Sequence, residues 1–338
     1  MRRAAADRPG RVVPDDVLIE MLRPAFPRVQ RASLEPLAGG ARNSNFCLQI
    51  DCLSDPLLLR IFEHDPVLCQ KEVDLLRRLR DEVPVPEVIY ANAIGLEEVP
   101  PFCLQSFEKG ISFQALREQC DPEAMAQAAR SVGVTLAAIH RITFPRGGWL
   151  TAGVVLSTPL MEGIHAMPRF VDHCLESAFQ QNRIGQELCD RVHQLMWSAI
   201  APLSVCEEQA NLVHGDFGER NILVRPGPKG WHVSAVLDWE FAVAGTPLAD
   251  FGNFLRYESA AYPASEPAFS SAYRDAGGLL PENWNRIRRV VDVVALTEKL
   301  TRNLLPENVL IELLELLEAT VEDRDAQFPW NRPATFGV

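Results

Sequence analysis

The sequence predicts an α+β fold in two parts, a small antiparallel-sheet lobe (residues 1–101) and a larger, mostly helical lobe (residues 111–338). Three observations favour it. Apolar runs bounded by turn residues fill the first part, as strands do, and lie near residues 32–37, 45–51, 57–62 and 88–91. From residue 121 onward apolar residues recur every three or four positions, which is the helical period. A single hairpin pattern, residues 222–237, stands among these helical segments.

The elements follow one another in a simple order. An amphipathic helix is expected over residues 15–24, before the first three strands. A second helix is expected to begin with Asp65 as N-cap and Pro66 in its first turn, and to end at the Val83-Pro84-Val85-Pro86 segment. Residues 102–110 are expected to be a strand that leads into a connection between the lobes. The helices predicted for the larger lobe cover residues 121–140, 168–200, 282–301 and 307–322.

Composition excludes several classes of protein. The net charge of -12 disfavours nucleic acid as a partner and suits a cationic substrate. No apolar stretch is long enough to span a bilayer, and the basic start of the chain lacks the apolar core of a secretion signal. The eight cysteines are scattered without close pairs, which indicates reduced thiols and a cytoplasmic protein rather than a zinc or disulfide framework.

The most informative segment runs from Leu212 to Asp238. Its hairpin pattern places Asn221 at the start of one strand and Asp238 at the end of the next, so antiparallel pairing returns both to one end of the ribbon. Asp216 lies five residues before Asn221, in the loop at the same end. One Asp and one Asn are a plausible ligand pair for Mg²⁺, and Asp216 is placed to accept a proton from an attacking hydroxyl.

At these residues the sequence resembles the aminoglycoside phosphotransferase family, small-molecule kinases with a protein-kinase-like fold. His214-Gly215-Asp216 with Asn221 is similar to the family's catalytic loop, and Val236-Leu237-Asp238-Trp239-Glu240 to its metal-binding segment. The resemblance implies that residues 1–101 form a nucleotide-binding lobe and residues 102–110 a hinge. It also implies that Asp216 is the catalytic base, that Asn221 and Asp238 hold Mg²⁺, and that ATP or GTP is the phosphate donor.

Two further features of this region are predicted to be structural. Asp250 lies in a second Asp-Phe-Gly triplet that does not follow a hairpin, so it is expected to cap or brace a helix. His214 is assigned a packing role, because phosphoryl transfer of this kind needs no imidazole.

Arg60 and Glu72 are predicted to form an ion pair in the small lobe. Arg60 is the single cation in an apolar strand, and Glu72 falls on the apolar face of the following helix, where a lone carboxylate would be costly to bury. The pair corresponds to the strand cation and helix glutamate with which kinases position phosphates, although the strand carries arginine where protein kinases have lysine. An ordinary semi-buried ion pair is the alternative.

The remaining nucleotide contacts are expected from two connections. A glycine-containing turn before the Arg60 strand is predicted to lay donors over phosphates, with Gly39, Gly40, Asn43, Ser44 and Asn45 as its residues. The 102–110 connection resembles the hinge that holds a purine, which makes Gln105, Ser106 and Phe107 candidates. A plain hairpin turn and a plain edge strand are the alternatives.

The acceptor is left open by the sequence. An aminoglycoside-like antibiotic or related metabolite is the first hypothesis, and an endogenous alcohol such as choline, homoserine or a sugar competes with it. Candidate carboxylates for binding ammonium groups, chosen by location only, are Asp172, Glu176, Glu258 and Asp292. Two other classes remain: a kinase-like nucleotide-binding protein without transfer activity, and a metal-dependent phosphohydrolase built on His214, Asp216 and Asp238.

Overall fold

The computed structural model describes residues 12–37, 43–258 and 264–322. The first lobe is built on a five-stranded antiparallel sheet in the order β1-β2-β3-β5-β4. Apolar side chains from the middle strands fill its core, and among them Leu48, Leu59 and Leu104 are fully buried. The strands are β1 (Ala32–Pro36), β2 (Ser44–Ile50), β3 (Leu57–Ile61), β4 (Val88–Asn92) and β5 (Phe102–Ser106).

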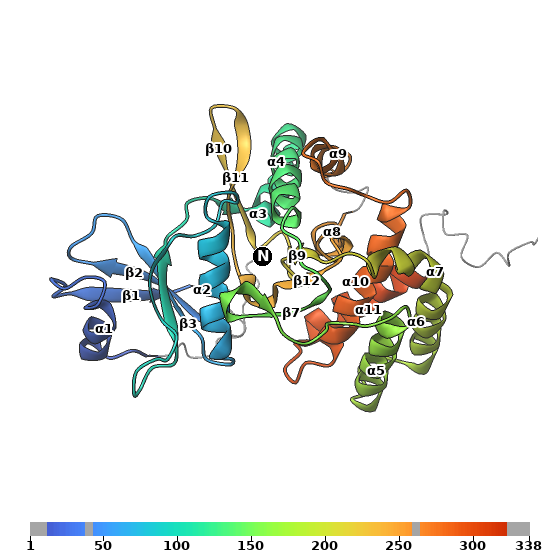
Figure 1. The fold of residues 1–338 in the computed structure, drawn as a ribbon, viewed down its shortest axis with the longest axis horizontal. Helices are drawn as coiled ribbons and strands as arrows, with labels where there is room; N and C mark the ends of the chain where they lie inside the picture. The colour runs from blue at the N-terminus through green and yellow to red at the C-terminus, as the bar shows by residue number, and fades with distance from the viewer. Residues whose placement is uncertain (1–11, 38–42, 259–263, 323–338) are drawn as a thin grey trace, which may run out of the picture.

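Two helices accompany this sheet. Helix α1 (Asp15–Leu22) packs beside β1, and α2 (Val67–Leu79) lies between the sheet and the second lobe (Figure 1). The predicted capping role of Asp65 is wrong: Pro66 is the N-cap, with no side-chain hydrogen bond to the first turn. Pro66 already has helical φ and ψ, so the helix begins directly after it without a capping carboxylate.

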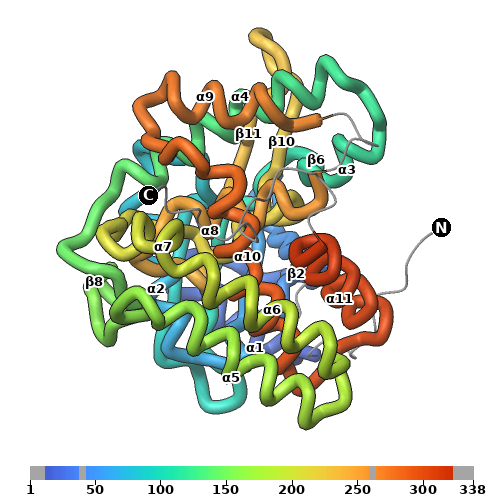
Figure 2. The backbone as a smooth tube through the Cα atoms, turned by 90° about the vertical axis from the view of Figure 1, so that its right-hand side faces the viewer, coloured from blue at the N-terminus to red at the C-terminus, as the bar shows by residue number. Residues whose placement is uncertain are grey.

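The second lobe is mostly helical, as predicted. Its long central helix α4 is capped by Asp121, whose carboxylate accepts from Glu123 N and Ala124 N, and it carries proline in its first turn. Helix α10 crosses the lobe beside α5, α8 and α11 (Figure 2). The helices are α3 (Phe113–Glu118), α4 (Pro122–His140), α5 (Ala166–Gln180), α6 (Gln186–Ser198), α7 (Ile200–Leu203), α8 (Leu248–Phe254), α9 (Ala268–Asp275), α10 (Trp284–Leu300) and α11 (Glu307–Glu322).

This lobe also contains two small sheets. The sequence predicted only one part of them, the hairpin of residues 222–237. One has the order β11-β10-β6 and the other β8-β7-β12-β9. They lie between the five-stranded sheet and the large helices in Figure 1, so the loops that leave them reach the region between the lobes. Their strands are β6 (Ile111–Ser112), β7 (Gly148–Thr151), β8 (Val155–Leu156), β9 (Asn211–Val213), β10 (Ile222–Gly227), β11 (Gly230–Val236) and β12 (Val243–Gly245).

The protein therefore has the bilobal, protein-kinase-like α+β architecture that the sequence predicts. Across the described ranges, no helix combines the length and the apolar character needed to cross a bilayer. All eight cysteines are free thiols.

Candidate active site between the lobes

A tight loop, residues 214–221, connects β9 to β10 and carries Asp216. Gly215 has φ of 81°, and a Cβ at this position would overlap the carbonyl oxygen of Phe241. Only glycine combines that backbone conformation with such a close approach. The loop backbone therefore runs directly against the segment that follows Asp238.

Asp250, on α8, fixes the start of the loop. Its Oδ2 accepts a hydrogen bond from His214 N at 2.8 Å, and its Oδ1 accepts one from Gly215 N at 3.0 Å. The carboxylate is fully buried and also lies 3.1 Å from His140 Nε2. Asp250 is structural, as predicted, but it braces the loop between β9 and β10 rather than capping its own helix.

His214 links the loop to the end of β11. Its Nε2 lies 2.9 Å from the carbonyl oxygen of Leu237, and its Nδ1 accepts a hydrogen bond from Asp216 N at 3.2 Å. A carbonyl oxygen only accepts and a backbone N–H only donates, so Nε2 faces an acceptor and Nδ1 faces a donor. Both ring nitrogens are committed to the scaffold, which leaves His214 unable to act as a base.

Asp216 and Asn221 meet directly. Asn221 Nδ2 donates to the backbone oxygen of Asp216 at 2.9 Å and to its Oδ2 at 3.1 Å. The Asp216 side chain remains 34% exposed, so one of its oxygens is oriented by the amide while the group stays accessible. A carboxylate held in this way is suited to receiving a hydroxyl proton.

The hairpin confirms the predicted return of Asn221 and Asp238 to one end. Strands β10 and β11 pair antiparallel from Ile222 opposite Val236, and Leu237 N donates to the carbonyl oxygen of Asn221 at 2.8 Å. Asp238 follows in the left-handed region, with φ of 67°. This conformation turns the chain sharply at the point where the predicted metal ligand lies.

The donor set at this end of the hairpin fits a hard divalent cation. Within the described ranges, no hydrogen bond reaches Asn221 Oδ1 or Asp238 Oδ2, whereas Asn221 Nδ2 and Asp238 Oδ1 are engaged. Mg²⁺ takes few protein oxygens and completes its shell with phosphate and water. Among the same residues, no three His, Cys, Asp or Glu side chains are grouped so that they could hold a metal ion. A site here would thus depend on one carboxylate, one amide and the nucleotide.

Arg60 lies at the centre of an acidic cluster that joins the lobes. Its Nη2 is 3.2 Å from Glu72 Oε2, which confirms the predicted pair, and it also lies 2.5 Å from Asp238 Oδ1 and 3.6 Å from Glu240 Oε2. Burial alone would lower the pKa of Arg60, but the three carboxylates raise it. Burial raises the pKa of Glu72 to about 7, against the opposing effect of Arg60. Through Arg60, the small lobe thus contacts the segment that carries Asp238, the predicted metal ligand.

A model of the phosphotransferase enzyme family matches residues 33–290 of this chain. The chain belongs to this phosphotransferase family. The match covers most of the chain, including the Arg60 strand, Glu72, the 214–221 loop and Asp238. The resemblance inferred from His214-Gly215-Asp216 and its neighbours is thereby confirmed.

Solved structures of aminoglycoside phosphotransferases share the fold. The structure of aminoglycoside phosphotransferase APH(4)-Ia superposes with a TM-score of 0.64 at 19% identity and covers 91% of this chain and 98% of its own. A GDP complex of an aminoglycoside 2'-phosphotransferase-IIIa gives a TM-score of 0.69 at 17% identity, covering 93% of this chain and 99% of its own. At identities this low, the superpositions show that the chain shares the fold of these structures and nothing further.

A shorter similarity links the chain to a larger human protein. Acyl-CoA dehydrogenase family member 11 from Homo sapiens is 34% identical in an alignment of 97 positions that covers 23% of this chain and 12% of that protein. The protein of the same name from Pongo abelii is 46% identical over 48 residues, or 14% of this chain and 6% of that protein. The chain thus spans only a small part of the length of these relatives.

Two further residues, Glu240 and Lys71, complete the charged cluster around Arg60. Glu240 is 5% exposed, and its Oε2 accepts from Asn43 Nδ2 at 2.7 Å. Lys71 is buried beside Glu72 and donates to the Glu240 carbonyl oxygen at 2.8 Å. Burial lowers the pKa of Lys71 to about 8. The sequence did carry a sign of this role. Lys71 is a charged residue on the apolar face of the helix, directly before Glu72.

The structure distributes the predicted loop residues among different contacts. Gly39 and Gly40 lie outside the described residues. Asn43 reaches Glu240, and Ser44 Oγ donates to Glu63 Oε1 at 2.5 Å. Asn45 Oδ1 is buried and accepts no hydrogen bond from the described residues. The three side chains therefore do not act as one cradle of donors here.

Two of the three predicted hinge residues, Gln105 and Ser106, lie in β5 and make contacts within the small lobe. Gln105 Nε2 lies 3.5 Å from Glu72 Oε1, so this side chain faces the cluster around Arg60. The backbone N–H of Ser106 donates to Glu87 O at 2.9 Å, so a contact of Ser106 with a purine would have to use another of its groups. Phe107, the first residue beyond β5, remains a candidate.

Lys299 is a site residue that sequence reasoning missed. It lies near the end of α10, and its Nζ is 3.8 Å from Asp216 Oδ1. Burial and the nearby Arg256 lower its pKa to about 8. Lys299 and Asp216 are 83 residues apart in the sequence, so they meet only because α10 packs against the loop.

The carboxylates proposed for binding ammonium groups are largely committed elsewhere. Asp292 accepts two hydrogen bonds from Arg256, at 2.8 and 2.5 Å, and Glu258 accepts from Arg117 at 3.1 Å. Asp172 accepts from Trp197 Nε1 at 2.9 Å and lies 2.7 Å from His193 Nδ1. Glu176 is exposed on α5. None of the four is a free acidic group beside Asp216.

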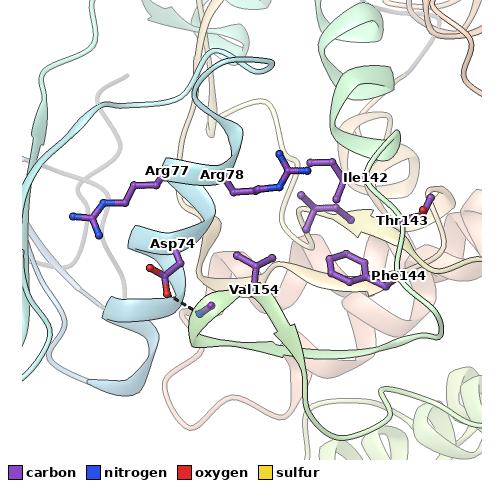
Figure 3. Close-up of a pocket in the computed structure, with 9 residues that line it drawn as sticks. Asp74, Arg77, Arg78, Ile142, Thr143, Phe144 and Val154 are labelled. Atoms are coloured by element: carbon purple, nitrogen blue, oxygen red, sulfur yellow. Dashed lines mark hydrogen bonds between the residues drawn. The ribbon is translucent and has the colours of Figure 1, made fainter.

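A pocket of about 430 Å³ lies apart from these residues, between α2 and the β7 region. Asp74 Oδ2 accepts from Gly153 N at 2.7 Å across it, and Arg78 extends toward Ile142 whereas Arg77 points away (Figure 3). Its lining includes none of the predicted site residues. The chemistry of the site therefore depends on the space around Asp216 and Asp238, not on this pocket.

Proposed function

We propose that this protein transfers the γ-phosphate of ATP or GTP to a hydroxyl group of a small molecule, an aminoglycoside-like antibiotic or a related metabolite. The observation that carries the proposal is the contact between Asp216 and Asn221 at the end of the hairpin that also delivers Asp238. Membership of the phosphotransferase family supports the same reaction class. Free cysteines throughout the chain support a cytoplasmic setting.

The side chains have separate roles in this reaction. Asp216 receives the proton of the acceptor hydroxyl and aligns the oxygen for in-line attack, while Asn221 orients the Asp216 carboxylate. Arg60, held by Glu72, provides positive charge on the small-lobe side. Positioning and charge neutralisation supply most of the acceleration, and no covalent enzyme intermediate forms.

Asn221 Oδ1 and Asp238 Oδ2 are the oxygens that would hold Mg²⁺. When bound, the ion would neutralise charge on the nucleotide phosphates. Arg60 Nη2 lies 2.5 Å from the other oxygen of that carboxylate, Asp238 Oδ1. The residues present therefore fit a divalent cation without a further protein ligand.

One observation favours a second function, nucleotide binding without transfer. The strand cation is arginine, and its Nη2 is already shared among three carboxylates, so it has less freedom to follow a phosphate than an unpaired lysine. A protein of this kind would bind nucleotide with Mg²⁺ and phosphorylate no acceptor.

A nucleotide and acceptor screen tests the proposal. We expect Mg²⁺-dependent release of ADP or GDP with at least one alcohol from a panel of aminoglycosides, choline, homoserine and sugars. Asp216→Asn should keep nucleotide affinity within about twofold and lower kcat by about 10²-fold or more, because the amide cannot accept the proton. Tight nucleotide binding with no turnover on any acceptor would favour the second function, and unchanged turnover in Asp216→Asn would refute the role of Asp216.

A further inference from the structure

The charge distribution around Asp216 departs from what a polycationic acceptor needs. Lys299 Nζ lies 3.8 Å from Asp216 Oδ1, and the lysine side chain is 21% exposed. Any acceptor that places its hydroxyl on the Asp216 carboxylate must therefore come within reach of this ammonium group. That geometry follows from α10 and the 214–221 loop alone, whichever nucleotide is bound.

The other charges near Lys299 cancel in pairs. Arg256 and Arg302 are the cations that act on it, and Asp292 and Asp216 are the carboxylates. Arg256 is bound twice by Asp292, and Arg302 donates to Glu298 at 3.0 Å. Lys299 has Asp216 as its single partner in the described part of the chain.

An ammonium group on the acceptor would lack a carboxylate partner of this kind. Two carboxylates of the large lobe that the sequence offered for binding ammonium groups are already paired, Asp292 with Arg256 and Glu258 with Arg117. Asp216 itself is required for the hydroxyl. An acceptor cation beside Asp216 would thus meet the Lys299 charge, whereas an acceptor anion would gain a direct partner.

We propose that Lys299 selects acceptor alcohols that carry an anionic group, a carboxylate or a phosphate, close to the reacting hydroxyl. Lys299 is then a specificity-determining residue that binds the acceptor anion, and of the two acceptor classes proposed above it favours an anionic metabolite over an aminoglycoside. This inference rests on the proposed phosphotransferase function, because it assigns Asp216 to the acceptor hydroxyl.

Three related alcohols separate the possibilities: gluconate, glucose and glucosamine, which are anionic, neutral and cationic. A short hydroxycarboxylate and glycerol phosphate extend the anionic arm, and kanamycin the cationic arm. With Mg²⁺ and the preferred nucleotide, we expect kcat/KM to be highest for an anionic member. Binding of each compound to the protein loaded with a non-hydrolysable nucleotide analogue is measured in parallel by thermal shift.

Variants then locate the selectivity. Lys299→Met should lower kcat/KM for the anionic acceptor by about 10- to 100-fold, mainly through KM, because one charge-assisted contact is lost. Lys299→Arg should retain most of the wild-type value, and Lys299→Glu should shift preference toward glucosamine. Lys229→Met, at the exposed turn of the β10–β11 hairpin, is the matched control and should leave kcat/KM unchanged.

The results distinguish two failures. If no nucleotide binds with Mg²⁺, the proposed function fails before the acceptor is considered. If nucleotide binds but no acceptor is phosphorylated, nucleotide binding without transfer is favoured and both proposals fail. If an acceptor is phosphorylated, but the wild type prefers the cationic members, or binds no anionic member, or Lys299→Met leaves the preference unchanged, the proposed role of Lys299 is overturned and the phosphotransferase assignment stands.

Discussion

Gly215 shows how a single residue sets the geometry of the site. Its φ of 81° and its closeness to Phe241 leave no room for a side chain, and the next residue is Asp216. The position of the Asp216 carboxylate, the proposed catalytic base, thus depends on the glycine that precedes it. The rest of the loop is less constrained, since a Cβ on Gly218 would meet nothing within 4 Å.

Gly215→Ala is expected to destabilise the protein by about 1–3 kcal/mol, because alanine is strained in this conformation and its Cβ overlaps a backbone oxygen. Turnover should also fall as Asp216 shifts. Urea unfolding and a kinase assay measure the two effects. Gly218→Ala is the matched control, expected within about 0.5 kcal/mol of wild type. Equal effects of the two substitutions would contradict this account.

The titration of Lys299 gives a pH prediction at the same scale. Its pKa is lowered from the usual value of a lysine to about 8 by burial and by Arg256 and Arg302, against the opposing effect of Asp216 and Asp292. The ammonium form is present below pH 8 and is lost as the pH rises. For an anionic acceptor, kcat/KM should therefore decline through about pH 8. The decline should be absent in Lys299→Arg, whose charge persists, and a flat wild-type profile would argue against the assignment.

Between elements, a buried network joins α3, the 214–221 loop and the segment before α9. Arg117 donates to Glu219 from Nε at 2.8 Å, and its Nη2 donates to Ser265 Oγ at 2.7 Å and to Glu258. Burial raises the pKa of Glu219, while Arg117 opposes the rise. The loop is therefore held from both ends, by Asp250 at its start and by Arg117 near Asn221.

Arg117→Met should destabilise the protein by about 3–5 kcal/mol, because it leaves the Glu219 carboxylate buried without its main partner. Adding Glu219→Gln to this variant should recover part of the loss, since a neutral amide is cheaper to bury. Chemical unfolding at pH 7 measures both. The exposed pair of Arg80 and Asp81 supplies the control, and Arg80→Met should cost less than about 1 kcal/mol. A small effect of Arg117→Met would show that the network is dispensable.

At the scale of the whole molecule, the two lobes share one charged centre. Arg60 and Glu72 come from the small lobe, whereas Asp238 and Glu240 come from the large one. A nucleotide with Mg²⁺ bound here would contact both lobes, and its binding energy would add to the stability of the folded chain.

Saturating Mg²⁺ and nucleotide, at about 100 times Kd, should stabilise the wild type by about 2.7 kcal/mol. In Asp238→Ala the Mg²⁺-dependent part of this gain should disappear, because a proposed ligand of the ion is removed. Thermal unfolding with and without EDTA measures the difference. Asp216→Asn is the comparison that should keep the full gain, and retention of the Mg²⁺ effect in Asp238→Ala would remove Asp238 from the metal site.

Local patterns in the sequence were enough to predict the lobes, the hairpin with Asn221 and Asp238 at one end, and the pair of Arg60 and Glu72. Each depends on short-range information: strand period, turn chemistry, or an isolated charge in an apolar run. The helix start at Asp65 was wrong because terminal residues are the least constrained by periodicity.

The tertiary structure alone decided which distant polar side chains meet. Lys299 reaches Asp216, Arg117 reaches Glu219, and Asn43 reaches Glu240 across 83, 102 and 197 residues. Sequence periodicity says which face of a helix is buried, but not which helix covers it, because that depends on how whole elements pack. The motif for transfer is therefore local in the chain, while the charges proposed to select the acceptor are assembled by the fold.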